Sequence, residues 1–355
     1  MGSLLRACHV NNFVEHRQRS TIYLFSVLIM LKPSNSALFR MLIKLLILVM
    51  LIFSSDRLIA FCLKNGLIRK YGLNSGAKVL CVGHSHTEMG VDAEIISKMI
   101  AVPVAKYSTS GADTTVRLAM LRHYFSLHPK STSVVVYDVA SNMFNSTAIG
   151  SNAYKLFYPF MGDSVMKDFL WSSAHSREEY FSRYLVAILR YNSPSASGLP
   201  SILNEAVYGL LGKKTFFYDR ISSKQVDRYV AKKRKESSQG RGLVIIPGAR
   251  KAFEETIDFI TSQGIRLVLV YIPTINLPTD INQDYRQFVE MMKSYTAKND
   301  KVVYLDYKEL YGDRYELFCD PEHLNRAGQK LVSEKIAEDL DRLGVLVNKE
   351  SNNRH

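Results

Sequence analysis

Cysteine is scarce in this chain of 355 residues, which contains only Cys8, Cys62, Cys81 and Cys319. No two of these cysteines have the spacing of metal ligands, and their scattered positions do not suggest a disulfide framework. Cys81 stands inside an apolar run, where cysteine usually behaves as a small buried hydrophobic residue. The cysteines therefore indicate neither a cysteine-based metal site nor a disulfide-stapled fold, and they leave the cellular compartment open.

Nucleic-acid-binding motifs and internal repeats are also missing. The net charge is nevertheless +13, and the densest basic run is Lys232-Lys233-Arg234-Lys235. No platform of arginine and aromatic side chains accompanies this charge. A surface close to anionic lipid or polysaccharide explains the charge as well as nucleic acid would, so we predict no nucleic-acid partner.

Long hydrophobic runs are few. The run from Ile22 to Leu31 is too short to cross a bilayer, but Leu45–Phe53 is unbroken and the apolar pattern resumes at Leu58–Leu63. These runs predict a single transmembrane signal anchor over about 37–57, in a region 37–63 that also includes the flank. A cleaved signal peptide is the alternative, although no small-residue cleavage site follows the apolar core cleanly.

Basic residues set the expected orientation of this anchor. A basic segment, 1–36, precedes it, and the positive-inside rule favours a cytoplasmic N-terminus with the large domain outside. Further basic residues follow the anchor, among them Arg57 and Lys64.

From Lys78 onward, short apolar runs alternate with helical patterns, which is typical of βαβ units. Helices are expected over Thr114–Leu127, Arg250–Gln263, Asp284–Lys298 and Arg326–Leu343. This alternation predicts an α/β domain over 72–345 with a mostly parallel sheet and right-handed crossovers. The five strand candidates are Lys78–Val82, Pro103–Tyr107, Ser133–Asp138, Arg266–Ile272 and Lys301–Leu305.

Residues 145–248 interrupt this alternation, and a polar tail, 346–355, follows the domain. The interrupting segment is rich in tyrosine and phenylalanine and contains helical stretches. An insertion of this length after a strand predicts a lid or a substrate platform.

Four polar motifs follow predicted strands or come close to the last one. Gly83-His84-Ser85 ends the first strand, and the Ser-x-x-Glu spacing of Ser85 and Glu88 predicts a helix capping box. Because the carboxyl ends of parallel strands share one edge of the sheet, we expect all four motifs to gather there. The other three are Ser110-Gly111, Ser141-Asn142 and Asp320-Pro321-Glu322-His323.

With these motifs the chain resembles the SGNH hydrolase superfamily, the relatives of GDSL esterases and lipases. Gly83-His84-Ser85 matches the first block, with His84 in place of the usual Asp, and Gly111 and Asn142 match the second and third. The stretch from Asp320 to Gly328, with its Asp-x-x-His-Leu-Asn pattern, is the most specific match. The resemblance implies a three-layer α/β/α sandwich around a five-stranded sheet of flavodoxin-like order.

The resemblance also assigns roles to the matched residues. Ser85 is the expected nucleophile, His323 its base and Asp320 the carboxylate that orients the base, because a serine hydroxyl needs a base to become a nucleophile. The expected oxyanion donors are the backbone amides of Ser85 and Gly111 and the side-chain amide of Asn142. Neither a cofactor nor a metal is expected.

A membrane anchor combined with such a domain is similar to bacterial envelope proteins that add or remove O-acyl groups on surface polysaccharide. We therefore expect a serine esterase or O-acyltransferase in the inner membrane, with its catalytic domain in the periplasm. Its partners would be an acylated glycan, the membrane and a membrane-bound protein that donates acyl groups. A catalytically degenerate domain that binds a glycan or a partner is an alternative.

A metal-dependent hydrolase is a second alternative. His-x-His at the end of a first strand, here His84 and His86, begins several metal sites. Asp138, Asp320 and His323 are the residues that could complete such a site.

Overall fold

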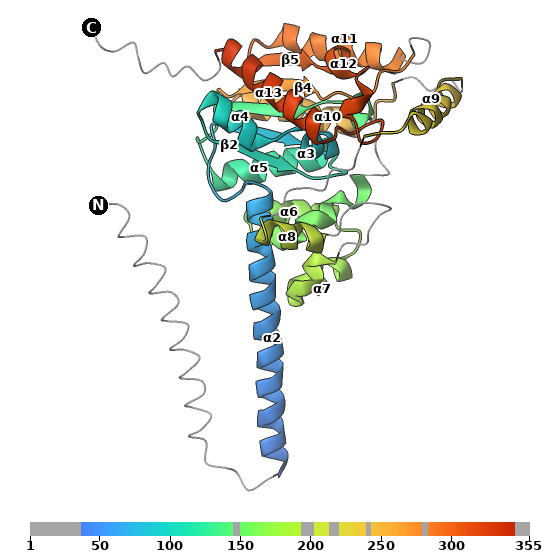
Figure 1. Cartoon of the computed structure of the whole chain (residues 1–355). Coiled ribbons are helices and arrows are strands. Elements are labelled where there is room, and N and C mark those ends of the chain that lie inside the picture. Colours follow the sequence, from blue (N-terminus) through green and yellow to red (C-terminus); the bar gives the residue numbers. More distant parts are fainter. Residues whose placement is uncertain are drawn as a thin grey trace, which may run out of the picture. The chain divides into compact units, whose positions relative to one another are not determined.

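A computed structural model of the chain describes residues 37–144, 150–192, 202–212, 220–238, 243–278 and 283–344 (Figure 1). The predicted N-terminal segment 1–36 and the tail 346–355 lie outside these residues, as do parts of the insertion 145–248. The chain divides into two units, Met1–Ser55 and Asp56–His355.

Helix α2 (Ala37–Lys70) contains the predicted anchor. Among the described residues, it is the one helix long and apolar enough to cross a membrane. The helix continues well beyond residue 57, where the anchor was predicted to end. Within the second unit its buried residues include Ala60, Leu63 and Leu67, which join the hydrophobic core. Packing of this apolar face explains why the helix continues past the polar pair Asp56-Arg57.

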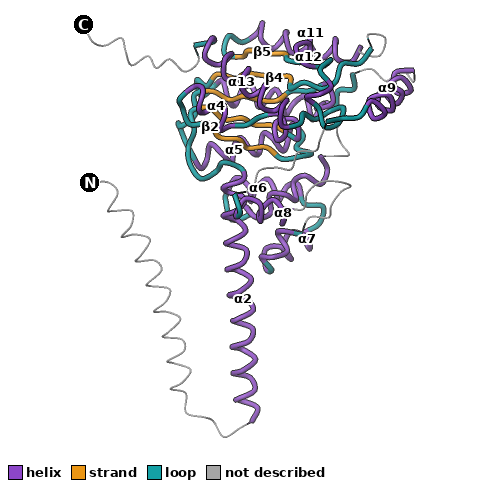
Figure 2. The backbone as a smooth tube through the Cα atoms, in the orientation of Figure 1, coloured by secondary structure: helices purple, strands orange, loops and turns teal. Residues whose placement is uncertain are grey.

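A five-stranded parallel sheet lies at the centre of the second unit, between helices (Figure 2). Its order, β2-β1-β3-β4-β5, confirms the predicted flavodoxin-like arrangement. Side chains alternate between the two faces, so that Leu80 and Val82 join one core cluster whereas Val79 and Cys81 join the other. The strands are β1 (Val79–Gly83), β2 (Val104–Ser108), β3 (Val134–Asp138), β4 (Arg266–Tyr271) and β5 (Val302–Asp306).

Helices cover both faces and complete the predicted three layers. One face packs against α5 (Thr114–Leu127), α10 (Pro247–Thr261) and α11 (Gln283–Lys298), and the other against α4 (Ala93–Ile100) and α13 (Arg326–Arg342). Three predicted helices agree with α5, α11 and α13 to within one residue at each end. Helix α10 begins earlier than predicted, at a proline, which suits a first turn because its missing N–H needs no partner there.

Shorter elements follow several strands at their carboxyl ends. Helix α3 begins directly after β1, and a 3-10 helix, η1, follows β3. The short elements are α3 (Ser85–Gly90), η1 (Ser141–Phe144), α12 (Lys308–Tyr311) and η5 (Tyr315–Leu317).

The described parts of the insertion are mostly helical. Aromatic side chains such as Phe157 and Phe160 are buried and belong to the same core as α5. The insertion also contacts the final part of α2, where the Tyr191 hydroxyl donates a hydrogen bond of 2.7 Å to the Ala60 carbonyl. Its role as a lid stays a prediction. The elements are η2 (Gly150–Phe160), α6 (Ser164–Ser173), α7 (Arg177–Leu185), η3 (Ala187–Tyr191), α8 (Ile202–Leu210) and α9 (Ser223–Ser238).

Two glycines allow α2 and α8 to approach closely. A Cβ atom on Gly66 would overlap the carbonyl oxygen of Ala206, and one on Gly209 would overlap the carbonyl oxygen of Gly66. The contacting atoms belong to the backbone, so no side-chain rotation relieves the overlap. This contact holds α8 of the insertion against α2.

We expect Gly66→Ala to destabilise the folded chain by about 1–3 kcal/mol, because the added methyl group forces two backbones apart. The matched control is Gly248→Ala in α10, where a Cβ atom meets nothing within 4 Å. Alanine favours helix formation there, so the control should be neutral or stabilising by up to about 1 kcal/mol. Urea unfolding of both full-length variants in detergent measures the difference, and equal stabilities would contradict the close contact.

Candidate active site

The structure brings Ser85, His323 and Asp320 together, although Ser85 and His323 are 238 residues apart in the chain. The Ser85 hydroxyl oxygen lies 2.8 Å from Nε2 of His323. Nδ1 of the same ring lies 2.9 Å from Oδ2 of Asp320 and 3.0 Å from Oδ1. The arrangement is that of a hydroxyl, a base and a carboxylate that orients the base.

The loop between η5 and α13 holds the histidine and the carboxylate in place. Oδ1 of Asp320 accepts hydrogen bonds from the backbone amides of Glu322 (2.8 Å) and His323 (2.9 Å). The Cys319 amide donates back to the His323 carbonyl over 3.0 Å, and Asn325 then caps α13. Because one short loop supplies both groups, their mutual geometry depends on few other parts of the fold.

The electrostatics of the pair favour a basic histidine. Burial lowers the pKa of His323, but the hydrogen bond and charge of Asp320 outweigh burial, so the net pKa lies above its usual value. Burial raises the pKa of Asp320, and the hydrogen bond and charge of His323 hold that pKa below its usual value. With Asp320 ionised, Nδ1–H donates to it, which leaves Nε2 to accept the Ser85 proton.

The predicted capping box at Ser85 and Glu88 is wrong. The N-cap of α3 is His84, whose Nδ1 accepts a hydrogen bond of 3.1 Å from the His86 amide. Ser85 is the first helical residue, and its hydroxyl turns toward His323 instead of the helix. Glu88 accepts a hydrogen bond of 2.9 Å from the Ser110 hydroxyl. His84, where the SGNH pattern has Asp, thus caps the helix that presents Ser85.

Asp138 fixes the start of α3 from the end of β3. Its Oδ2 accepts hydrogen bonds from the His84 amide (3.2 Å), the Thr87 amide (3.1 Å) and the Thr87 hydroxyl (2.7 Å). Nη1 of Arg117, a fully buried residue of α5, donates to the Asp138 carbonyl over 2.7 Å and lies 3.6 Å from Oδ1. Burial raises the pKa of Asp138, but the adjacent His84 and Arg117 outweigh it and hold that pKa well below its usual range.

Sequence reasoning missed Arg117. The available signal was an arginine between Val116 and Leu118 in an otherwise apolar stretch of predicted helix. A buried arginine needs a carboxylate or carbonyl partner, and the carboxyl end of the neighbouring strand offers both in Asp138.

The two other predicted oxyanion residues follow the strands on either side of β1. Gly111 has φ +80°, which suits glycine, and the loop before it is attached to β1 through the Thr109 amide and the Gly83 carbonyl (3.4 Å). Asn142 lies in η1 after β3, and its side chain is exposed. Both therefore lie at the carboxyl edge of the sheet, and their contribution to an oxyanion hole stays a prediction.

The structure brings together only some of the residues that could form the alternative metal site. Ligand atoms of His84, His86 and Asp138 lie within 4.8 Å of one another, whereas Asp320 and His323 form the hydrogen-bonded pair beside Ser85. Nδ1 of His86 is buried without a hydrogen-bond partner among the described residues. Burial lowers the pKa of both His84 and His86, so both rings are neutral near pH 7.

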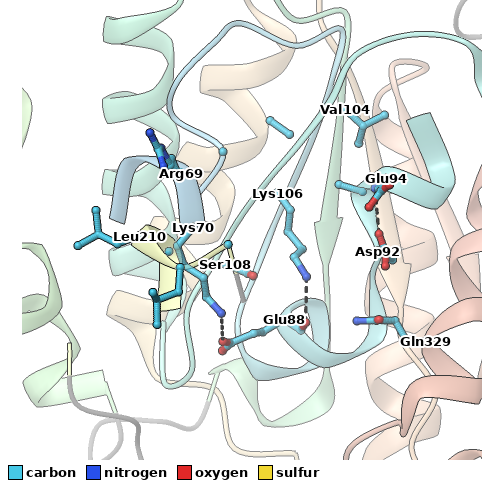
Figure 3. Close-up of a pocket in the computed structure, with 16 residues that line it drawn as sticks. Arg69, Lys70, Glu88, Asp92, Glu94, Val104, Lys106, Ser108, Leu210 and Gln329 are labelled. Atoms are coloured by element: carbon cyan, nitrogen blue, oxygen red, sulfur yellow. Dashed lines mark hydrogen bonds and ion pairs between the residues drawn. The ribbon is translucent and has the colours of Figure 1, made fainter. Parts of the chain in front are cut away.

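A cavity of about 560 Å³ lies at the β2 edge of the sheet, and Glu88 of α3 is one of the residues that line it (Figure 3). Neither Ser85 nor His323 lines it. Lys70 of α2 lies 3.5 Å from Glu88 and 3.0 Å from Glu205 of α8. These ion pairs connect α2, α8 of the insertion and α3, the helix that carries Ser85.

No protein-family model matches the chain, and no curated protein matches it. Solved structures align at low identity. A GDSL-like lipase from Bacteroides thetaiotaomicron has 10% identity and a TM-score of 0.34, with 75% of this chain and 88% of the lipase aligned. A family two carbohydrate esterase from Clostridium thermocellum, in complex with cellohexaose, has 10% identity and a TM-score of 0.32, with 76% and 65% aligned.

An acetyl xylan esterase from Butyrivibrio proteoclasticus aligns similarly, with 9% identity, a TM-score of 0.31 and coverage of 76% of this chain and 64% of the esterase.

Replacing Arg117 should destabilise the fold strongly. We expect Arg117→Met to lower the free energy of unfolding by about 3–5 kcal/mol, because the Asp138 carboxylate then stays buried without its cation. The matched control on the same helix is Arg122→Met, which removes an exposed ion pair with Glu255 (3.5 Å) and should cost less than about 1 kcal/mol. Urea unfolding followed by circular dichroism compares them, and similar losses would contradict the role given to Arg117.

Proposed function

We propose that this chain is a serine esterase or O-acyltransferase that forms an acyl-enzyme intermediate on Ser85. The observation that carries the proposal is the continuous pair of contacts from the Ser85 hydroxyl through His323 to Asp320, at 2.8 and 2.9 Å. His323 is the only base in contact with the Ser85 hydroxyl among the described residues, and its raised pKa suits proton abstraction.

The reaction begins when His323 Nε2 takes the Ser85 proton as Oγ attacks the ester carbonyl carbon. The tetrahedral intermediate then collapses and the C–O bond to the alcohol breaks. The departing alkoxide receives the proton from His323 Nε2, which leaves an acyl group on Ser85. A water molecule or a sugar hydroxyl then attacks the acyl carbonyl carbon while His323 Nε2 takes its proton. The bond from this carbon to Ser85 Oγ breaks, and Oγ receives the proton, which regenerates the free serine. The acyl group leaves as an acid when water attacks, or as an ester of the sugar.

The negative charge on the intermediate needs donors that are already in place. The Ser85 amide is at the start of α3, where N–H groups have no partner within the helix and the helix dipole favours negative charge. The Gly111 amide and the Asn142 side chain complete the proposed set. Loss of one such donor typically costs about 3 kcal/mol of transition-state stabilisation.

The proposed setting is the bacterial inner membrane, with α2 as a single-pass anchor and the catalytic domain in the periplasm. The apolar length of α2 and the net charge of +13 support a position close to an anionic surface. The proposed substrate is an acylated envelope polysaccharide, and for a transferase a membrane-bound protein supplies the acyl group. Exclusion of water from the acyl-enzyme separates a transferase from an esterase.

A metal-dependent hydrolase is the second candidate, and the cluster of His84, His86 and Asp138 favours it. Its ligands would be two neutral imidazoles and one carboxylate, a set that suits zinc. The charge of Arg117, 3.6 Å from Oδ1 of Asp138, opposes a bound cation. Stoichiometric zinc in the purified protein together with full activity of Ser85→Ala would favour this candidate over the serine mechanism.

Hydrolysis of an aryl acetate by the full-length protein tests the proposal. Ser85→Ala and His323→Ala should each lower kcat at least about 10⁴-fold with the fold intact, because nucleophile and base act as a unit. Asp320→Asn should keep a higher residual rate than either. The control Ser97→Ala, in α4, should leave the rate unchanged.

Activity of Ser85→Ala equal to wild type would contradict the serine mechanism. Failure of the wild-type protein to cleave any ester, combined with saturable glycan binding, would support the degenerate binding protein instead.

The pH dependence should report His323. Because its pKa is raised, kcat/KM should increase with pH through an apparent pKa above the usual 6.5 and reach a plateau once the ring is neutral. Asp320→Asn removes the carboxylate that raises this pKa, and burial alone lowers it, so the acidic limb should move to lower pH. If the acidic limb lay at the same pH in the wild-type protein and in Asp320→Asn, this would contradict the assignment of His323 as base and Asp320 as its partner.

A further inference from the structure

We propose that an exposed apolar surface on the insertion lies in the interfacial layer of an anionic bilayer. This surface, the α7 patch, consists of Trp171, Phe181, Tyr184, Leu185, Val186 and Ile188. The proposal rests on the membrane anchor proposed above and adds a second membrane contact, made by the catalytic unit itself.

The α7 patch has the pattern of a helix face that lacks a partner within the described chain. Phe181, Tyr184 and Leu185 have the spacing i, i+3 and i+4, which places them on one side of α7, and Ile188 lies just beyond the end of α7, in η3. Their exposed fractions are 51%, 56%, 64% and 38%. Single exposed apolar residues are common, but a contiguous group of this kind usually marks an interaction site.

Hydrogen bonds fix the patch beside the residues that follow the apolar run in α2. Oδ1 and Oδ2 of Asp56 accept hydrogen bonds of 2.8 Å from the Ile188 and Ala187 amides. Nη2 of Arg57 donates to the Leu185 carbonyl over 2.6 Å. In the chain, Asp56 comes directly after Ser54-Ser55, where the unbroken apolar run has just ended. If that run spans the bilayer, Leu185 and Ile188 are held at the level of its surface.

The chemistry around the patch fits a lipid headgroup layer. Trp171 packs against Tyr180 and Phe181, with ring centroids 5.1 and 6.2 Å apart, and the Arg177 guanidinium lies 3.6 Å from the centre of the Trp171 ring. Tryptophan and tyrosine concentrate at membrane interfaces, and nearby arginines favour anionic lipids. Arg57 lies at the same place but is paired with Asp56 over 3.8 Å, whereas Arg190, which donates to the Tyr184 carbonyl over 3.4 Å, adds a positive charge there.

We infer lipid as the occupant of this surface, in preference to a second protein, because the neighbouring part of α2 also exposes apolar side chains. Leu58, Ile59 and Phe61 of α2, which belong to the same unit, are also exposed, by 50–64%. The part of α2 that follows Asp56-Arg57 thus exposes apolar side chains as well. A bilayer surface at this level contacts both α2 and α7 without any additional partner.

Trp171 is the only tryptophan in the chain, so its fluorescence reports the α7 patch directly. The full-length protein is reconstituted into vesicles of phosphatidylglycerol and phosphatidylcholine, with or without bromine on the upper part of the phosphatidylcholine acyl chains. We expect the brominated lipid to quench the emission at least about two-fold, as for a side chain at interfacial depth. Anionic vesicles should give more quenching than vesicles of phosphatidylcholine alone.

The double variant Leu185→Asp, Ile188→Asp should lose most of this quenching and become more accessible to iodide in the water. Both side chains are exposed, so the fold should tolerate the change. The matched control is Leu310→Asp on α12, which is 54% exposed and lies outside the patch; its quenching should equal that of wild type.

Flotation of the same vesicles separates failure of the anchor from failure of the patch. Protein that does not float with the vesicles would contradict the anchor and, with it, the inference. Protein that floats while Trp171 responds only to iodide would overturn the inference alone. Shielding from iodide that depends on protein concentration, without quenching by brominated lipid, would identify a second copy of the chain as the partner and also overturn it.

Discussion

The buried carboxylate of Asp138 is the constraint on which the candidate site depends. It ends the central strand β3, accepts three hydrogen bonds from residues 84–87 and faces the fully buried Arg117 of α5. The carboxylate must therefore remain ionised and paired, because an unpaired buried charge costs several kcal/mol. Its geometry sets where β1 ends and α3 begins, and so where the Ser85 hydroxyl points. His323 and Asp320 then need only one loop, next to α13, to reach that hydroxyl.

Much of this could be predicted from the sequence where local patterns decide the outcome. The apolar runs gave all five strands, and Thr114–Leu127 gave α5 with both ends correct. The spacing of Asp320 and His323 predicted a local pair because three residues separate them. Tertiary contacts decided the rest: His84 caps α3 instead of Ser85, since the Ser85 hydroxyl turns toward a histidine 238 residues away. The pairing of Asp138 with Arg117 could not be predicted for the same reason, because no local sequence pattern links an arginine in a helix to the end of a strand.

The final part of α2 connects the proposed anchor to the candidate site within the second unit. It packs against α8 at Gly66, forms ion pairs from Lys70 to Glu88 and Glu205, and bonds to η3 through Asp56. Glu88 in turn belongs to α3 and holds Ser110, next to the proposed oxyanion residue Gly111. A chain of close contacts thus runs from the final part of α2 to α3, the helix that carries Ser85. Apolar length alone predicted the anchor, but it gave no sign of these contacts.

The most direct test of the central claim is to label the full-length protein with a serine-directed fluorophosphonate and to map the modified residue by mass spectrometry. An activated serine reacts because its base removes the hydroxyl proton, whereas an ordinary serine does not. The serine mechanism predicts a single adduct at Ser85, with no label on Ser85→Ala and much slower labelling of His323→Ala. Ester hydrolysis by a protein that takes no label at Ser85 would contradict it.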